Sequence, residues 1–251
     1  MALAIALTAA VLAATSAAPD TTGSGPAVPQ ACAPLDSALR EAPGVAADVA
    51  GTLATHGGVV RWLPERGPVR VWVQPRPATL AGPGLLAAGW SQAVRDGADS
   101  WQGVVPGLAL VIVGDSARAD VRVTWGAVPA TPTALLGAVA PDGRGDTQAL
   151  AYAAASAVRP AARTALAATA DGRAAAALVV LALEGEAALD TPDAVRTVVR
   201  HEFGHVLGLA HHAAPRSVMA PVVRATRLAP GDRDALRLLY RLPPGARCRV
   251  N

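Results

Sequence analysis

The chain has 251 residues, 52% of them hydrophobic, which is enough apolar side chain for one compact domain with flanking segments. All 22 basic residues are arginine, 19 acidic residues offset them, and the arginines are scattered along the chain, so the net charge is +3. This distribution argues against nucleic-acid binding, which uses a clustered basic surface, and we expect no nucleic-acid partner.

The N-terminus carries an export pattern. Residues 2–14 are almost wholly apolar and are followed by the small residues Ser16, Ala17 and Ala18. This pattern resembles a secretory signal peptide, and the apolar run is shorter than the about 20 residues that a membrane helix needs. We therefore expect residues 1–18 to be a signal peptide, the protein to be secreted or exported to the cell envelope, and no stable membrane span.

Proline, glycine, serine and threonine are frequent in residues 19–34, which predicts a linker, and residues 35–56 favour a short helix. We interpret residues 19–58 as a linker or N-terminal segment. Its Cys32 and the second cysteine, Cys248, lie near opposite ends of the chain. In an exported protein these two would form a disulfide, and two free thiols are the alternative if the protein is not exported.

Strand and helix patterns follow one another in the first half. Apolar and polar residues alternate in residues 68–77 and in residues 119–126, as in half-buried strands. Residues 84–107 repeat large apolar side chains every three or four positions, as an amphipathic helix does. The continuous apolar run of residues 108–115 predicts a strand buried on both faces. This order of elements favours an α/β arrangement of layers.

The following stretch is less regular. Residues 127–148 hold proline and glycine throughout and predict a loop. Short strands are expected at residues 149–155 and at residues 177–183, and the alanine-rich piece between them is ambiguous. A last helix is expected at residues 231–242.

A helix start precedes the most informative segment. Thr191 can cap the helix, Pro192 suits its first turn, and Asp193 favours the positive end of its dipole. This helix runs into residues 201–212, HEFGHVLGLAHH, which contain four of the five histidines. Such a concentration of imidazoles in a histidine-poor chain indicates a metal site.

The spacing of three histidines supports this interpretation. His201 and His205 are four residues apart on a helix, so both imidazoles point to one spot. Gly208 tolerates the positive φ that ends a helix, and the turn brings His211 back as a third ligand. Three histidines suit tetrahedral zinc and leave a fourth position for water, as in catalytic sites. Glu202 lies too far round the helix to bind the metal but can reach that water as a general base.

The extended pattern HExxHxxGxxH resembles the metzincin clan of zinc proteases. The clan's second hallmark, the Met-turn, has a counterpart in residues 217–221, SVMAP, with Met219 as the turn methionine. Within the clan, the segment is most similar to the matrixins, the family of matrix metalloproteases and their bacterial relatives. Residues 227–242, RLAPGDRDALRLLYRL, resemble the closing matrixin helix, and softer matches fall within residues 60–126.

The resemblance implies a zincin-like fold of the α+β or α/β class. This fold has a twisted, mostly parallel sheet with an antiparallel edge strand, a long active-site helix, a Met-turn and a C-terminal helix. We expect the catalytic domain at residues 59–243 and a C-terminal tail at residues 244–251, with no appended targeting domain.

The implied activity is that of a secreted zinc metalloendopeptidase, a hydrolase that cleaves peptide bonds through a zinc-bound water activated by Glu202. We expect one catalytic zinc ion, a polypeptide substrate and a monomer. The alternative is a catalytically silent zinc-binding module used for partner binding. The enzyme is favoured, because a decayed protease would usually have lost the base or a ligand.

The same resemblance suggests a substrate cleft. An extended peptide would add as an extra strand along an edge strand formed by Leu150, Ala151, Tyr152 and Ala153. An apolar wall after the Met-turn would favour a hydrophobic side chain just after the cut bond, and it would come from Pro221, Val222 and Val223.

The sequence also departs from the matrixin pattern. His212 stands where matrixins usually have serine or threonine. A fourth histidine could compete for the metal, but we expect His212 at the surface, because three ligands and water complete a tetrahedron. Tyr152 stands where the family has a histidine of its second zinc site, so we expect no second zinc. Asp142 and Asp146 leave calcium binding open without supporting it. Cys32 only loosely resembles the zinc-blocking propeptide cysteine of animal matrixins, so the disulfide is favoured.

Overall fold

The computed structural model describes residues 28–77, 87–129, 132–139, 147–151, 161–183 and 189–248. Six strands form one sheet in the order β2-β1-β3-β6-β5-β4. In chain order they are β1 (Val69–Val73), β2 (Leu110–Ile112), β3 (Val121–Gly126), β4 (Thr147–Ala151), β5 (Ala162–Thr169) and β6 (Ala174–Ala182). The predicted fold class, a mostly parallel sheet of the zincin-like kind, is confirmed.

The antiparallel part of the sheet lies beside its β4 edge. β2, β1, β3 and β6 pair in parallel, whereas β5 runs antiparallel to both of its neighbours, β6 and β4. β4 is the last strand among the described residues, so the antiparallel strand stands one position in from the edge. β5 is also the alanine-rich piece whose structure the sequence pattern left ambiguous.

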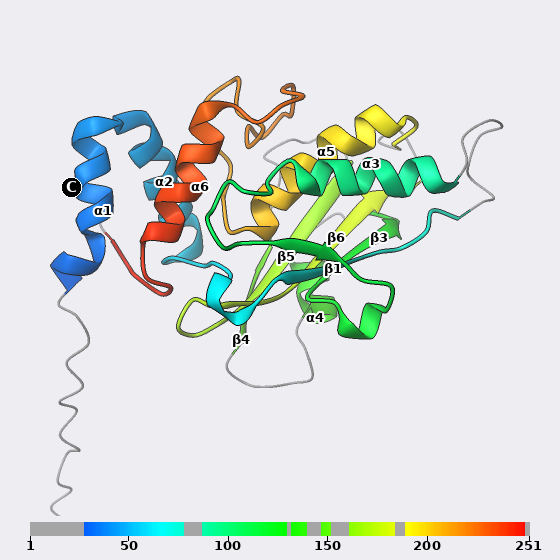
Figure 1. Cartoon of the computed structure of the whole chain (residues 1–251), viewed down its shortest axis with the longest axis horizontal. Helices are drawn as coiled ribbons and strands as arrows, with labels where there is room; N and C mark the ends of the chain where they lie inside the picture. Colours follow the sequence, from blue (N-terminus) through cyan, green and yellow to red (C-terminus); the bar gives the residue numbers. More distant parts are fainter. Residues whose placement is uncertain are drawn as a thin grey trace, which may run out of the picture.

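Helices cover both faces of the sheet and one end of it (Figure 1). α3 (Ala87–Asp99) and α5 (Pro192–Val206) lie on one face, and the short α4 (Leu136–Val139) lies on the other. α1 (Val28–Glu41), α2 (Pro43–His56) and α6 (Pro230–Arg241) pack together at one end. Short 3₁₀ turns occupy Pro64–Arg66, Ser116–Arg118 and Pro132–Leu135. None of the described helices is both long and apolar enough to cross a membrane.

The two faces of β6 take part in two separate cores. Val179 and Leu181 are fully buried in the main core, together with α3 and α5. Leu178 and Val180 belong to a smaller core that includes Leu135 and other residues on the α4 face. This strand is therefore buried on both sides, as its continuous apolar sequence predicts.

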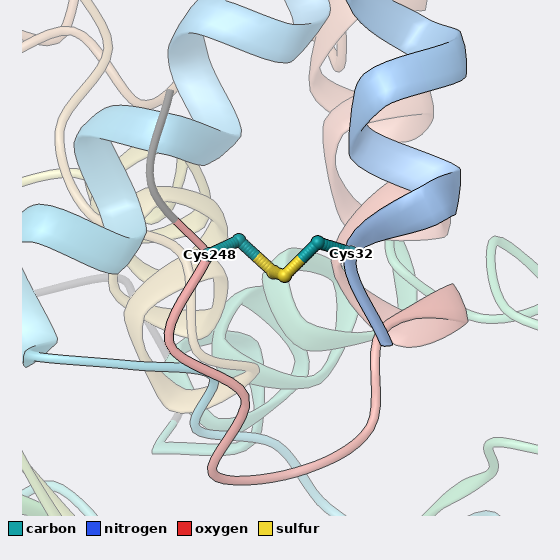
Figure 2. The surroundings of a disulfide bond; sticks show 2 residues. All are labelled: Cys32 and Cys248. Carbon is teal, nitrogen blue, oxygen red and sulfur yellow. A yellow bond between two sulfur atoms is a disulfide. The ribbon is translucent and has the colours of Figure 1, made fainter. Parts of the chain in front are cut away.

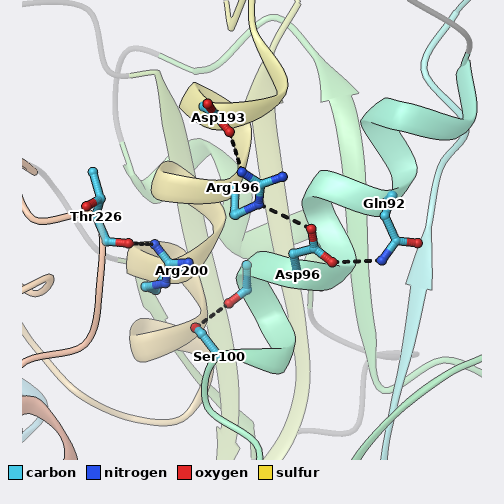
Figure 3. A network of polar contacts seen from close by, with 8 residues as sticks. Gln92, Asp96, Ser100, Asp193, Arg196, Arg200 and Thr226 are labelled. Atoms are coloured by element: carbon cyan, nitrogen blue, oxygen red, sulfur yellow. Dashed lines mark hydrogen bonds and ion pairs between the residues drawn. The ribbon is translucent and has the colours of Figure 1, made fainter.

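A polar network ties α3 to α5 ahead of the histidine motif (Figure 3). Arg196 on α5 donates to Asp96 on α3 at 3.2 Å and also contacts Asp193 of its own first turn. Farther along, the indole Nε1 of Trp101 donates to the backbone oxygen of Arg200 at 2.8 Å, in a buried position. These bonds fix the rotation of α5 about its axis, which sets the direction of the residues that follow Arg200.

Residues 108–115 differ from their predicted environment. Their strand, β2, is an edge strand of three residues that pairs with β1 alone among the described strands, and Val111 and Ile112 are exposed. The expectation of burial on both faces is wrong here, because a short apolar run has the same pattern whether one or two of its sides are covered. Only Leu110 contributes a buried side chain from this strand.

The predicted linker at residues 19–34 is also wrong in its second part, because α1 already begins at Val28. Proline at the start of a helix costs little, since the first turn has no partner for its backbone N–H. Pro34, inside α1, does remove one backbone hydrogen bond. Burial of Leu35 and the tertiary contacts of α1 with α2 and α6 stabilise the helix against that cost.

Cys32 and Cys248 form a disulfide, which joins α1 to the segment after α6 (Figure 2). The two residues are 216 positions apart in the chain. The bond therefore closes almost the whole described chain into one loop. Cys32 is consequently not available as a metal-blocking thiol in this structure.

We expect the double variant Cys32→Ser, Cys248→Ser to unfold at lower denaturant concentration than the parent. Loss of a cross-link over so long a loop lowers the free energy of unfolding by about 5 kcal/mol in the chain-entropy model. Denaturant titration followed by circular dichroism measures this, and the parent with reductant is the control. An unchanged midpoint in both would show that the bond does not constrain the unfolded chain.

His56 gives stability a pH dependence. Burial at the end of α2 lowers the pKa of His56 from 6.5 to about 4. The unfolded chain therefore takes up a proton that the folded chain refuses, so the stability that His56 contributes falls as the pH drops from about 6.5 and levels off below about 4. The size of the pKa shift limits this loss of the free energy of unfolding to about 3 kcal/mol.

In metal-free protein, we expect the free energy of unfolding of His56→Gln to change less between pH 6.5 and 4 than that of the parent. Both chains keep every other titrating group, so the difference isolates His56. Parallel pH profiles would contradict this assignment.

Candidate metal centre and active site

The metal-binding segment begins on α5, whose start is set by local sequence. Thr191 caps the helix, with its Oγ1 accepting the backbone N–H of Ala194 at 3.2 Å. The helix continues to Val206, so His201 and His205 lie one turn apart on the same face. Both side chains are buried.

The chain then turns back over the end of α5. Gly208 has φ +99°, a left-handed backbone conformation that residues other than glycine adopt only with strain. Its α-carbon also packs against another segment, since a Cβ there would stand 2.1 Å from the carbonyl oxygen of Val60. This turn brings His211 to the two helical histidines.

The three imidazoles meet at their Nε2 atoms. The distance from His205 to His201 is 3.1 Å, and His211 lies 3.3 Å from each of them. These three residues form a group with metal-binding geometry within the part of the chain that the structure describes. Sequence reasoning named the same three.

Two backbone carbonyls settle how these rings are protonated. His201 Nδ1 lies 2.6 Å from the carbonyl oxygen of Val218, and His205 Nδ1 lies 2.8 Å from that of Leu209. A carbonyl only accepts, so each Nδ1 must carry the proton and donate it. In the neutral form of each ring, the Nε2 atom then carries a lone pair, and this lone pair faces the other histidines.

This arrangement fits a zinc ion. A tetrahedral ion with bonds of about 2.0 to 2.1 Å holds its ligand atoms roughly 3.3 to 3.4 Å apart, close to the separations found here. Burial and the neighbouring imidazoles keep His205 and His211 neutral: the pKa of His205 lies well below its usual value, and that of His211 falls to about 4. Neutral imidazole is the form that binds metal.

Glu202 lies beside this cluster in a buried position. The hydroxyl of Thr164, on β5, donates to Glu202 Oε2 at 2.6 Å. Burial raises the pKa of Glu202, and the nearby His201, Thr164 and Arg163 oppose that rise. A carboxylate with a raised pKa holds a proton more readily near neutral pH, which suits a general base. Neither Thr164 nor Arg163 stood out in the alanine-rich sequence around them.

The turn that begins at Ser217 packs against α5 and supports the three-histidine cluster. Met219 is fully buried against α5, so close that a Cβ on Gly204 would stand 2.1 Å from its sulfur. The buried carboxylate of Asp232, on α6, accepts from the hydroxyl of Ser217 and from the backbone N–H of Val218. Since the carbonyl oxygen of Val218 is also the acceptor for His201, Asp232 acts on this ligand through one intermediate residue.

His212 does not lie at the surface, and that expectation is wrong. Only 2% of His212 is exposed. Its Nδ1 lies 3.6 Å from Asp48 Oδ2 of α2, and its backbone N–H donates to Met219 at 2.8 Å. The packing of α2 over this segment buries the side chain, and α2 is about 160 residues away in sequence.

The residues expected to line a substrate cleft are described only in part. Leu150 and Ala151 end β4, where Ala151 pairs with Ala165, the residue next to Thr164. After the Met-turn, Pro221 and Val222 are exposed and Val223 is half-buried. Outside the described residues lie Tyr152, Ala153, Asp142 and Asp146.

We expect Gly208→Ala to lose zinc affinity and stability. Alanine in the left-handed region costs about 1 to 2 kcal/mol, and its Cβ would also overlap the carbonyl of Val60. The matched control is Gly51→Ala. Gly51 lies inside α2 with open space around its Cβ position, so this variant should be more stable than the parent by about 0.5 to 1 kcal/mol. Thermal unfolding and chelator competition measure both effects, and equal zinc affinity in the two variants would refute the role of the turn.

Comparison with known proteins agrees with this geometry. A model of the matrixin family matches residues 83–241. The chain is 44% identical over 54 residues to matrix metalloproteinase-25 of Homo sapiens, and 46% identical over 50 residues to matrix metalloproteinase-25 of Mus musculus. These segments cover 19% and 17% of this chain but only 10% and 8% of the two relatives, so the chain matches about a tenth of their length. Because the family model spans well over half of the 251 residues, this chain belongs to the matrixin family.

Proposed function

We propose that this protein is a secreted zinc-dependent endopeptidase. His201, His205 and His211 would hold the ion, Glu202 would act as the general base, and residues 59–243 would form the catalytic domain. Membership of the matrixin family points to a metalloendopeptidase, and the chemistry of the site supports the finer assignment.

One observation carries the proposal. Three Nε2 atoms lie within 3.3 Å of one another, and in the neutral rings of His201 and His205 the Nε2 atom carries a lone pair, because Nδ1 donates to a carbonyl. Lone pairs this close repel one another unless a cation lies between them. A cation between the rings would remove this repulsion, and this supports a metal site over a histidine-rich helix that binds nothing.

The protein's own groups divide the remaining work. When bound here, zinc supplies Lewis-acid chemistry, lowering the pKa of a water ligand to about 7 and polarising a carbonyl. Thr164 fixes Glu202 Oε2, so Oε1 is the oxygen that would accept the proton of the attacking water and later pass it to the leaving amine. The raised pKa of Glu202 suits both steps.

The peptide would bind at the β4 edge of the sheet. Among the described residues β4 is the outermost strand, and its register brings the Ala151 end next to the β5 residue that contacts Glu202. An extended peptide can add to such an edge by main-chain hydrogen bonds. Pro221, Val222 and Val223 are proposed as the apolar wall for the side chain after the cut bond.

Export is part of the proposal. The disulfide between Cys32 and Cys248 is compatible with an oxidising compartment, as is the signal-peptide pattern of residues 1–18. Calcium binding has no support from the described residues.

We expect the purified, zinc-loaded protein to cleave a mixed peptide library, and Glu202→Gln to reduce cleavage at least about 100-fold, because general-base catalysis is removed. Glu202 is not a ligand, so zinc content should be unchanged. The matched control is Glu65→Gln, on an exposed 3₁₀ turn, which should cleave like the parent. Products are read by mass spectrometry.

The outcomes separate the candidate functions. Cuts that vanish in Glu202→Gln but persist in Glu65→Gln would establish the endopeptidase and its specificity. A folded, zinc-loaded parent that makes no cuts would favour the non-catalytic binding module. A parent that binds no zinc would reject both.

A further inference from the structure

We propose that Thr52, on α2, is a positioning residue for the third metal ligand, so that the N-terminal helix pair is a working part of the metal site. This inference rests on the proposed zinc site. It concerns a segment outside the region matched by the family model, which begins at residue 83.

The contact is direct and buried. The Oγ1 of Thr52 accepts the backbone N–H of Ala210 at 3.2 Å, and neither residue has appreciable exposure. This bond holds the peptide group between Leu209 and Ala210, which lies one residue before His211, and the carbonyl of the same group is the acceptor for His205. A buried N–H that loses its acceptor costs free energy, so the segment would move to find another partner.

A second contact comes from the same face of α2. Asp48 lies four residues before Thr52, one helical turn away, and its Oδ2 is 3.6 Å from His212 Nδ1. The two α2 residues therefore contact the two sequence neighbours of His211: Thr52 contacts Ala210, and Asp48 contacts His212. Other bonds also hold this segment: the Leu209 backbone accepts from His205 and donates to Gly204, and the His212 backbone donates to Met219.

His211 needs such support more than the helical ligands do. His201 and His205 are fixed by the backbone of α5, and each ring also donates to a carbonyl. His211 comes from an irregular segment after Gly208 and is only partly buried. Groups that orient a ligand from behind typically change metal affinity 10- to 100-fold when they are removed.

The test compares three substitutions at one position. Thr52→Val keeps the shape but removes the acceptor, Thr52→Ala removes both, and Thr52→Ser keeps the acceptor. The matched control is Thr55→Val, on the exposed side of the same helix. Zinc affinity is measured by chelator competition, and unfolding of the metal-free protein is measured in parallel.

We expect Thr52→Val and Thr52→Ala to bind zinc about tenfold more weakly or worse, and Thr52→Ser and Thr55→Val to bind it like the parent. The absorption spectrum of the cobalt-loaded protein should change in the first two only. For peptide cleavage by Thr52→Val and Thr52→Ala, kcat should fall by a larger factor than KM rises. The reason is that the substitutions affect the metal ligands and leave the peptide-binding edge unchanged.

A packing role gives a different pattern. Thr52→Val would then resemble the parent in zinc affinity, Thr52→Ala would lose stability in the metal-free protein, and no cobalt spectrum would change. That pattern would overturn the inference. If Thr52→Val does not fold, the cobalt spectrum of Thr52→Ala, compared with that of Thr52→Ser, still separates the two roles, because a packing role leaves this spectrum unchanged. A parent that binds no zinc would overturn the proposed function, whereas a zinc-binding parent matched by Thr52→Val and Thr52→Ala would overturn this inference alone.

Discussion

Three imidazole nitrogens that face one another at 3.1 to 3.3 Å are the constraint on which the rest of the structure depends. The lone pairs of neutral His201 and His205 repel at such a distance, so the fold must hold these rings in place until a cation compensates. The carbonyls of Val218 and Leu209 do this for two rings by accepting from Nδ1, which fixes both the orientation and the tautomer. The site is therefore defined by backbone positions in the surrounding turns as much as by the histidines.

Those backbone positions are themselves held from several directions. Asp232 of α6 binds the peptide of Val218, and Val60 packs against the α-carbon of Gly208. Thr52 of α2 binds the peptide of Ala210. Segments that are far apart in sequence thus converge on one short stretch, whereas the sheet contributes chiefly Thr164 and its contact with Glu202. A substitution in any of these supports should act through the ligand it orients.

The features that could be predicted from the sequence are those fixed by local pattern. Helical spacing places His201 and His205 together, and the cap at Thr191 starts α5 as expected. β5 could not be recognised by periodicity, because alanine gives no contrast between faces, although Asp171-Gly172 is a hairpin signal between β5 and β6. The burial of His212 depends on contact with Asp48, and no local pattern encodes a contact across about 160 residues.

The disulfide has a consequence for the metal site through this same convergence. α1 and α2 form a pair of 14-residue helices, too small to fold by themselves, and they depend on packing against α6 and on the bond from Cys32 to Cys248. Opening of this pair would withdraw Thr52 from Ala210 and Asp48 from His212 together. Because the cross-link keeps α1 close to the end of the chain, the pair can close again without a long search. Redox conditions that preserve the disulfide would therefore also preserve the geometry around His211.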